Sequence, residues 1–152
     1  MKLSNFDVAS VLYCLPSGLV TFMKENKVYL AGGFIRAVLA DEEPSDIDLF
    51  SRSREEALGM SAKLANALDI TDTFASTNSY TLRSDDLEYP IQFIYAWTYN
   101  NAHALISSFD FTIAQAAIWF ENGEWQSITA DTFSADLASK QLVYTAPERH
   151  ED

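Results

Sequence analysis

The chain has little cysteine, few basic residues and no long apolar run. Its one cysteine, Cys14, cannot form an intramolecular disulfide, which fits a reducing compartment. Cys14 lies on the apolar stripe of an expected helix, and we expect it to be buried as a small hydrophobic side chain. No apolar segment approaches the roughly twenty residues that span a bilayer, and Met1 to Leu15 lacks the features of a signal peptide. We therefore expect a soluble, cytoplasmic protein that has no membrane partner.

Basic residues are not only scarce but scattered along the chain. Ten Lys and Arg stand against 22 Asp and Glu, so the formal net charge is −12 at pH 7. Proteins that hold long nucleic acids neutralise the phosphates with clustered Lys and Arg, and the sequence contains no such cluster. The composition therefore disfavours tight binding of a long nucleic acid by this chain alone. A solvated surface accounts for most of the acidity.

The length of 152 residues predicts one domain, because such a chain buries roughly two thirds of the surface that its unfolded form exposes. We expect this domain over residues 1–147 and a short flexible tail over residues 148–152. Helical and strand-like segments follow one another irregularly, which favours an α+β fold over a regular series of βαβ units.

Hydrophobic periodicity predicts the order of the elements. Helices are expected over residues 5–15, 17–25, 34–40, 53–68, 100–107 and 133–139. Strands are expected over residues 28–31, 46–50, 71–76, 79–83, 91–96, 113–120 and 124–128. Asn122-Gly123 predicts a hairpin turn between the last two strands, and Ser53, three residues before Glu56, has the spacing of a capping box.

Two carboxylates stand close together in one of the expected strands. Because side chains alternate between the two faces of a strand, Asp46 and Asp48 project from one face while Ile47 and Leu49 point into the core. Carboxylates placed side by side repel each other, and a divalent cation such as Mg²⁺ or Mn²⁺ relieves the repulsion. For this pair taken alone, an exposed strand edge without a ligand is the alternative.

A glycine pair precedes the carboxylates by about a dozen residues. Gly32-Gly33 stands between a short strand and a helix, where glycine lets the backbone approach a ligand and helix N–H groups favour a phosphate. Arg36, about one turn into the helix, could bind the same phosphate or be a surface side chain. Taken together, these residues and the carboxylate pair are typical of metal-assisted phosphoryl or nucleotidyl transfer.

Gly32-Gly33-Phe34-Ile35-Arg36 followed by Asp46-Ile47-Asp48-Leu49 resembles the Gly-Gly-x-x-Arg and Asp-x-Asp signature of the polymerase-β-like nucleotidyltransferase superfamily. The chain is most similar to the head domain of bacterial CCA-adding tRNA nucleotidyltransferases and poly(A) polymerases. Two weaker matches follow in order. Asp110 to Ala116 is similar to the family's Arg-Arg-Asp-Phe-Thr-Ile-Asn-Ala segment, and Asp131 to Leu137 resembles its Asp-x-Phe-Gly-Gly-x-x-Asp-Leu segment.

This resemblance implies a nucleotidyltransferase fold, in which helices flank a mixed β-sheet. It implies that Asp46 and Asp48 bind two Mg²⁺ ions, which would hold the triphosphate of an NTP and activate an attacking hydroxyl. Gly32 and Gly33 would lie on the phosphate side, with Arg36 as a phosphate or structural partner. The implied reaction is transfer of a nucleoside monophosphate from an NTP to a hydroxyl acceptor.

The sequence departs from the family pattern at three points. The strand expected near residues 90–94 offers Gln92 where the family usually supplies a third carboxylate, and a neutral amide is a poorer metal ligand. Asp110 could substitute for it in catalysis, or could equally cap a helix or turn, but Ser108-Phe109 replaces the basic pair before its counterpart. Nothing resembles the family's Glu-Asp-x-x-Arg motif, so we expect a stand-alone, phage-type member that lacks the tRNA-handling domains.

Two hypotheses about function follow. The first is a minimal nucleotidyltransferase that uses Mg²⁺ or Mn²⁺ and an NTP, with a small molecule or a protein favoured over free tRNA as acceptor. The second is a catalytically degenerate nucleotidyltransferase fold that binds a nucleotide or a protein partner as a regulator, either antitoxin-like or a phage accessory factor.

Overall fold

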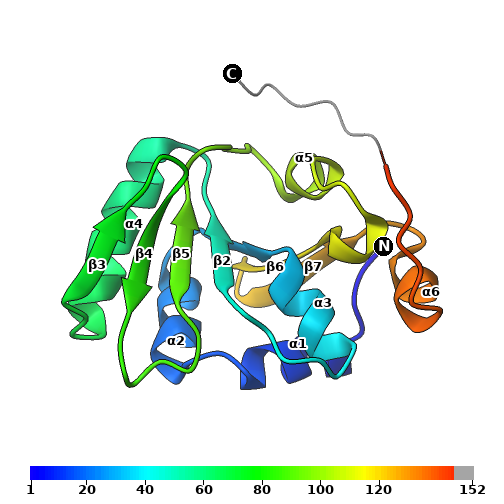
Figure 1. Ribbon diagram of the computed structural model, residues 1–152, viewed down its shortest axis with the longest axis horizontal. Coiled ribbons are helices and arrows are strands. Elements are labelled where there is room, and N and C mark those ends of the chain that lie inside the picture. The colour runs from blue at the N-terminus through cyan, green and yellow to red at the C-terminus, as the bar shows by residue number, and fades with distance from the viewer. Residues whose placement is uncertain (146–152) are drawn as a thin grey trace.

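Seven strands form one mixed sheet in the order β3-β4-β5-β2-β1-β6-β7 (Figure 1). The computed structural model describes residues 1–145, so the tail predicted at 148–152 lies outside the described residues. β2 and β5 are parallel, and every other neighbouring pair is antiparallel. The strands are β1 (Tyr29–Ala31), β2 (Ile47–Phe50), β3 (Asp72–Ala75), β4 (Ser79–Arg83), β5 (Ile91–Ile94), β6 (Ala116–Glu121) and β7 (Glu124–Thr129).

Six α-helices and one short 3₁₀ helix accompany the sheet in the described part of the chain. They are α1 (Asn5–Tyr13), α2 (Ser17–Glu25), α3 (Gly33–Leu39), α4 (Arg54–Ala67), α5 (Ala102–Ser107), η1 (Thr112–Ala114) and α6 (Phe133–Ala138). The larger hydrophobic core joins α1 to α4 with the sheet, whereas α5 packs with a smaller core. Figure 1 shows α5 at the opposite side of the view from α1 and α2. No helix within residues 1–145 is long and apolar enough to cross a membrane.

Strand β2 shows how the sequence pattern assigns side chains to the two faces of the sheet. Ile47 and Leu49 are fully buried in the larger core. Phe50 points the other way and packs with Tyr29 in the smaller core beside α5. Since side chains two residues apart share a face, Asp48 lies on the same face as Phe50. The alternation predicted for this strand is therefore confirmed.

The local signals for helix and turn formation are confirmed as well. The Ser53 hydroxyl accepts a hydrogen bond of 3.1 Å from the Glu56 N–H and so caps α4. The Glu56 carboxylate does not complete the capping box, because it binds the Arg52 guanidinium at 3.0 Å. Between β6 and β7, Asn122 and Gly123 both have positive φ angles, 55° and 76°, as a two-residue type I′ hairpin requires.

Some details differ from the predictions, among them the ends of several elements; β2, for example, begins at Ile47 and leaves Asp46 outside the strand. The strand expected from residue 113 begins only at Ala116, because Thr112–Ala114 forms the 3₁₀ helix η1. Cys14 is exposed, not buried. It caps the C-terminus of α1 after the helix ends at Tyr13, so it does not continue the apolar stripe of that helix.

Candidate functional site

The carboxylate pair lies at the N-terminal end of β2, in the middle of the sheet. Asp46 directly precedes the strand and Asp48 is its second residue; both are half-buried. One carboxylate oxygen of Asp48, Oδ1, is completely buried and has no hydrogen-bond partner among the described residues. Burial, and then the charge of Asp46, raise the pKa of Asp48 to about 6. The fold thus holds a desolvated carboxylate beside a second one, and residues 1–145 supply no hydrogen-bond donor to its buried oxygen.

The glycine turn follows β1, the strand that pairs with β2. β1 pairs with β2 in antiparallel register, with Leu30 opposite Leu49. If the same antiparallel register is extended past Leu30, Ala31 comes opposite Asp48, and Gly32 comes opposite Ile47. The Gly32 N–H donates a hydrogen bond of 3.4 Å to the Ala116 carbonyl of β6, which fixes the turn to the sheet.

The two glycines serve different purposes. Gly32 has φ 88° and ψ −143°, a conformation that side chains with a Cβ rarely adopt. Gly33 is the first residue of α3, is exposed, and a Cβ built there would meet no atom within 4 Å. Gly32 is therefore needed for the backbone turn, and Gly33 leaves open space next to it.

We predict opposite results for alanine at these two positions. Gly32→Ala forces a Cβ into a backbone region that strongly disfavours it, and we expect a loss of about 1–3 kcal/mol in the free energy of unfolding. Gly33→Ala is the matched control and should change stability by less than about 1 kcal/mol, because its backbone is helical and the space is open. Urea denaturation of both variants measures the difference. Equal stability of the two variants would contradict a strained turn at Gly32.

Arg36 pairs with an acidic side chain that follows α3. Its Nη1 forms an ion pair of 2.7 Å with Glu42 Oε1, and this contact lowers the pKa of Glu42. Arg36 and Glu42 line a hollow between α3, η1 and α6 that also includes Ile113 and Lys140. This arrangement favours the structural role that the sequence analysis left open for Arg36 over a contact to phosphate.

Asp110 follows α5 and is half-buried. Its carbonyl oxygen accepts a hydrogen bond of 2.8 Å from the Thr145 N–H. Residues 1–145 contain no group of three His, Cys, Asp or Glu placed to hold a metal ion. The described residues therefore do not group Asp110 with Asp46 and Asp48, and its catalytic role stays a prediction.

The two segments with weaker motif matches, Asp110 to Ala116 and Asp131 to Leu137, are joined by a hydrogen bond that the sequence did not predict. The Thr112 hydroxyl donates a hydrogen bond of 2.5 Å to Asp136 Oδ2, and both residues are buried. This bond joins η1, from the first match, to α6, from the second. The spacing of 24 residues carries no recognisable signal, so only the fold identifies the pair.

Gln92 lies directly beside Asp48. The parallel register of β2 and β5 pairs Asp48 with Gln92, and the antiparallel register of β4 and β5 pairs Gln92 with Thr81. Since paired residues in a sheet share a face, Thr81, Gln92 and Asp48 form a row of polar residues across three strands. The Gln92 amide thus lies beside Asp48, at the position where the family resemblance implies a third carboxylate.

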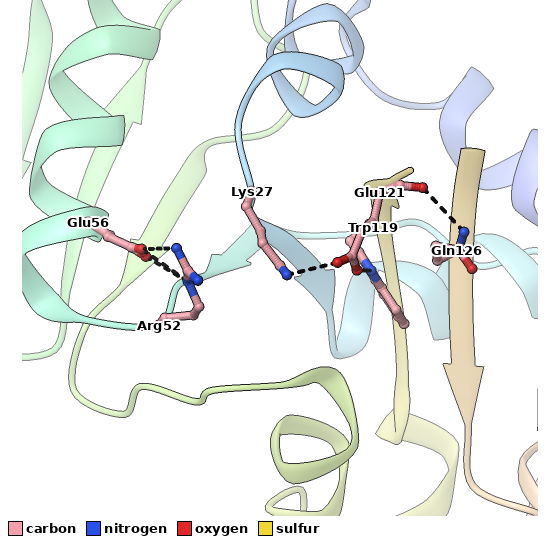
Figure 2. Close-up of polar contacts among 6 residues, drawn as sticks. All are labelled: Lys27, Arg52, Glu56, Trp119, Glu121 and Gln126. Atoms are coloured by element: carbon pink, nitrogen blue, oxygen red, sulfur yellow. Dashed lines mark hydrogen bonds and ion pairs between the residues drawn. The ribbon is translucent and has the colours of Figure 1, made fainter. Parts of the chain in front are cut away.

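A second polar group lies at the other end of β1 and β2 (Figure 2). Lys27 Nζ contacts Glu121 Oε2 at 3.1 Å, and the Trp119 indole donates to Glu121 Oε1 at 2.9 Å. Arg52 binds Glu56 through Nε and Nη2, as Figure 2 also shows. These cations are matched by carboxylates, so they form no free basic surface for a polyanion. The expectation drawn from the scattered basic residues is consistent with this pairing.

Comparison with known proteins identifies a family and a fold. The chain matches the family model described as "Gabija anti-defense 2 family protein" over residues 3–140. A curated relative, "Gabija anti-defense 2" of Bacillus phage SPbetaL7, is 23% identical over 117 residues, which are 77% of this chain and 28% of the relative. The chain therefore spans less than a third of the length of that relative.

Solved structures of a tRNA nucleotidyltransferase and of CCA-adding enzymes share the fold. A tRNA nucleotidyltransferase complexed with a primer tRNA and an incoming ATP analog has a TM-score of 0.65 at 20% identity, covering 84% of this chain and 38% of that one. A CCA-adding enzyme with CTP has a TM-score of 0.67 at 17% identity, covering 91% and 35%. The Thermotoga maritima CCA-adding enzyme complexed with tRNA has a TM-score of 0.61 at 17% identity, with the same coverage.

At these identities the structural likeness concerns the fold, since one fold can carry many activities. It confirms the expected mixed sheet with flanking helices and the polymerase-β-like nucleotidyltransferase architecture. The match of residues 3–140 to the family model covers most of the chain. The chain is a member of the Gabija anti-defense 2 family, built on the fold of a nucleotidyltransferase head domain.

Proposed function

We propose that this chain binds a nucleoside triphosphate together with Mg²⁺ or Mn²⁺ and transfers the nucleoside monophosphate to a hydroxyl acceptor. The observation that carries the proposal is the carboxylate pair at the start of β2. Asp48 buries one oxygen without a hydrogen-bond partner in the described chain, directly beside Asp46 and the Gly32-Gly33 turn. Burying an unpaired carboxylate is costly, and proteins accept such a cost mainly at sites that bind a ligand.

The donor set fits a hard divalent cation. Mg²⁺ prefers carboxylate oxygens and is commonly held by one or two carboxylates and the phosphates of its substrate. Asp46 and Asp48 hold the cation in this proposal, and Gly33 leaves space for a phosphate beside it. When bound, the cation neutralises phosphoryl oxygens, which is the main requirement of phosphoryl-group transfer.

The acceptor is a small molecule or a protein, in preference to free tRNA. The net charge of −12 repels a polyanion, and the cations Lys27, Arg36 and Arg52 are each matched by a carboxylate. Some structural neighbours are bound to tRNA, but they are more than twice as long as the part that this chain matches. The shared fold therefore supports nucleotide binding more directly than it supports tRNA binding.

Family membership supports a role for the chain in the conflict between phage and host. The relative named "Gabija anti-defense 2" comes from a Bacillus phage. We therefore propose that the chain is a phage protein that acts in the host cytoplasm against the Gabija defence, through its nucleotide site or through a protein partner of that defence.

A second candidate function is nucleotide binding without turnover, in which the chain acts as a regulator. The residue that favours it is Gln92, which lies beside Asp48 and offers a neutral amide. An amide cannot serve as a base, and it binds a hard cation more weakly than a carboxylate does.

Nucleotide titration tests the proposal. We expect ATP, GTP, CTP or UTP to bind in the presence of Mg²⁺ or Mn²⁺ and not in the presence of EDTA, as measured by isothermal titration calorimetry. Incubation with α-³²P-labelled nucleotide and Mn²⁺ then separates the two candidates, because label transferred to small-molecule or protein acceptors demonstrates turnover. If none of the four nucleotides binds with either metal, the proposed site is wrong.

A further inference from the structure

We infer that Gln92 restricts the carboxylate site to one divalent cation, so that the chain holds its nucleotide as a one-metal complex. This inference rests on the proposed function and specifies the metal content of the same site. It follows from the placement of Gln92, from the charges around it and from the absence of a third acid among the residues that the structure describes.

The placement is set by backbone pairing. Gln92 is the register partner of Asp48 across the parallel β2–β5 pair, and neighbouring strands lie about 4.8 Å apart. Its neighbours Ile91 and Phe93 are fully buried in the larger core. The alternation therefore turns the half-buried Gln92 to the face that carries Asp48.

The protein offers carboxylate ligands for one cation only. Asp46 and Asp48 together contribute two carboxylates, which would hold one Mg²⁺ or Mn²⁺ together with the phosphates of the nucleotide. A second ion at the usual separation of about 3.5–4 Å would need further anionic ligands to offset its repulsion from the first. On the adjacent strand that position is held by a neutral amide, and beyond it by the hydroxyl of Thr81, which is buried.

No other acid replaces the missing charge. Within residues 1–145 no three His, Cys, Asp or Glu come close enough together to hold a metal. The Gln92 carboxamide can instead donate N–H groups to a phosphate oxygen. A one-metal site favours nucleotide binding over fast transfer, because two-metal sites hold both the attacking and the leaving oxygen.

Counting bound metal tests the inference. The full chain is mixed with non-hydrolysable analogues of ATP and CTP, and protein-bound Mn²⁺ is counted by equilibrium dialysis with electron paramagnetic resonance. We expect one Mn²⁺ per chain in the wild type and two in Gln92→Asp, with the second ion bound roughly tenfold or more tighter than in the wild type. Gln126→Glu adds the same charge on β7, three strands away from β2, and should still bind one.

Each result has a defined meaning. Two Mn²⁺ per wild-type chain would overturn the inference while leaving the proposed nucleotide site intact, and so would a Gln92→Asp variant that stays at one. Failure of both analogues to bind would instead overturn the proposed function and this inference with it. Circular dichroism checks that the Gln92→Asp variant folds. If this variant does not fold, the Gln92→Glu variant is used in its place. The number of Mn²⁺ ions bound by the wild type tests the inference without any variant.

Discussion

Asp48→Asn is expected to weaken binding of the Mg²⁺–nucleotide complex by roughly 100-fold or more. Changing groups that merely support a metal ligand already costs 10–100-fold in affinity, and Asp48 is a direct ligand in the proposed site. Asparagine keeps the size of the side chain and removes its charge, so a loss reports on metal binding and not on packing. Calorimetric titration of the variant with nucleotide and Mg²⁺ measures the effect.

The control for this experiment is Asp85→Asn. Asp85 is exposed in the loop between β4 and β5, and its substitution changes the net charge by the same amount. We expect this variant to bind nucleotide as the wild type does. Unchanged affinity of Asp48→Asn would remove Asp48 from the metal site, whereas an equal loss in Asp85→Asn would show that the effect comes from overall charge.

The same substitution, Asp48→Asn, is expected to stabilise the metal-free protein by about 1–3 kcal/mol near pH 7.5. The pKa of Asp48 rises from 3.8 to about 6 on folding, with burial as the first cause and the charge of Asp46 as the second. Ionised Asp48 is therefore less favourable in the folded chain than in the unfolded one. Asparagine removes this cost because it carries no charge to desolvate.

The stabilisation by Asp48→Asn should depend on pH, and the raised pKa of Asp48 sets the direction of that dependence. Between about pH 4 and pH 6 the folded chain binds more protons at Asp48 than the unfolded chain does, so the contribution of Asp48 to stability falls as the pH rises. The difference between Asp48→Asn and the wild type should be close to zero below pH 4, grow through this interval and level off above pH 6.5. Urea denaturation at a series of pH values measures it. A difference that does not change with pH would contradict the raised pKa.

Added Mn²⁺ should act in the opposite direction. It binds only the folded site and stabilises the wild type by mass action, whereas Asp48→Asn should respond little. A residue whose removal stabilises the free protein but abolishes ligand binding is typical of a functional site, where stability is given up for binding. Asp85→Asn should show neither effect, since its side chain lies in solvent.

Much of the site could be predicted from the sequence because its signals are local. The alternation of Asp46 and Asp48 with buried Ile47 and Leu49 depends only on the geometry of one strand. The turn at Gly32 depends on a backbone conformation that glycine alone adopts easily. Residue type and spacing therefore specified these features before any long-range contact was known.

Other predictions depended on long-range contacts and needed the fold. Arg36 had the spacing of a phosphate ligand, yet its guanidinium pairs with the Glu42 carboxylate. Asp110 was a candidate third acid, yet it forms no three-acid group with Asp46 and Asp48 in the described chain. In both cases the partners are chosen by how the elements pack, which spacing along the chain does not encode.

By itself, the sequence determined the order of the elements, the carboxylate pair, the glycine turn and the resemblance that predicted the fold, because these follow from residue type and short-range periodicity. The sequence also pointed to Gln92 through the resemblance, but only the tertiary structure decided the register that pairs it with Asp48. Gln92 is 44 residues from Asp48, and the register between parallel strands β2 and β5 is set by the burial of Ile47 and Leu49 against one core. That register places an amide next to the carboxylates, and on this placement the proposed one-cation site rests.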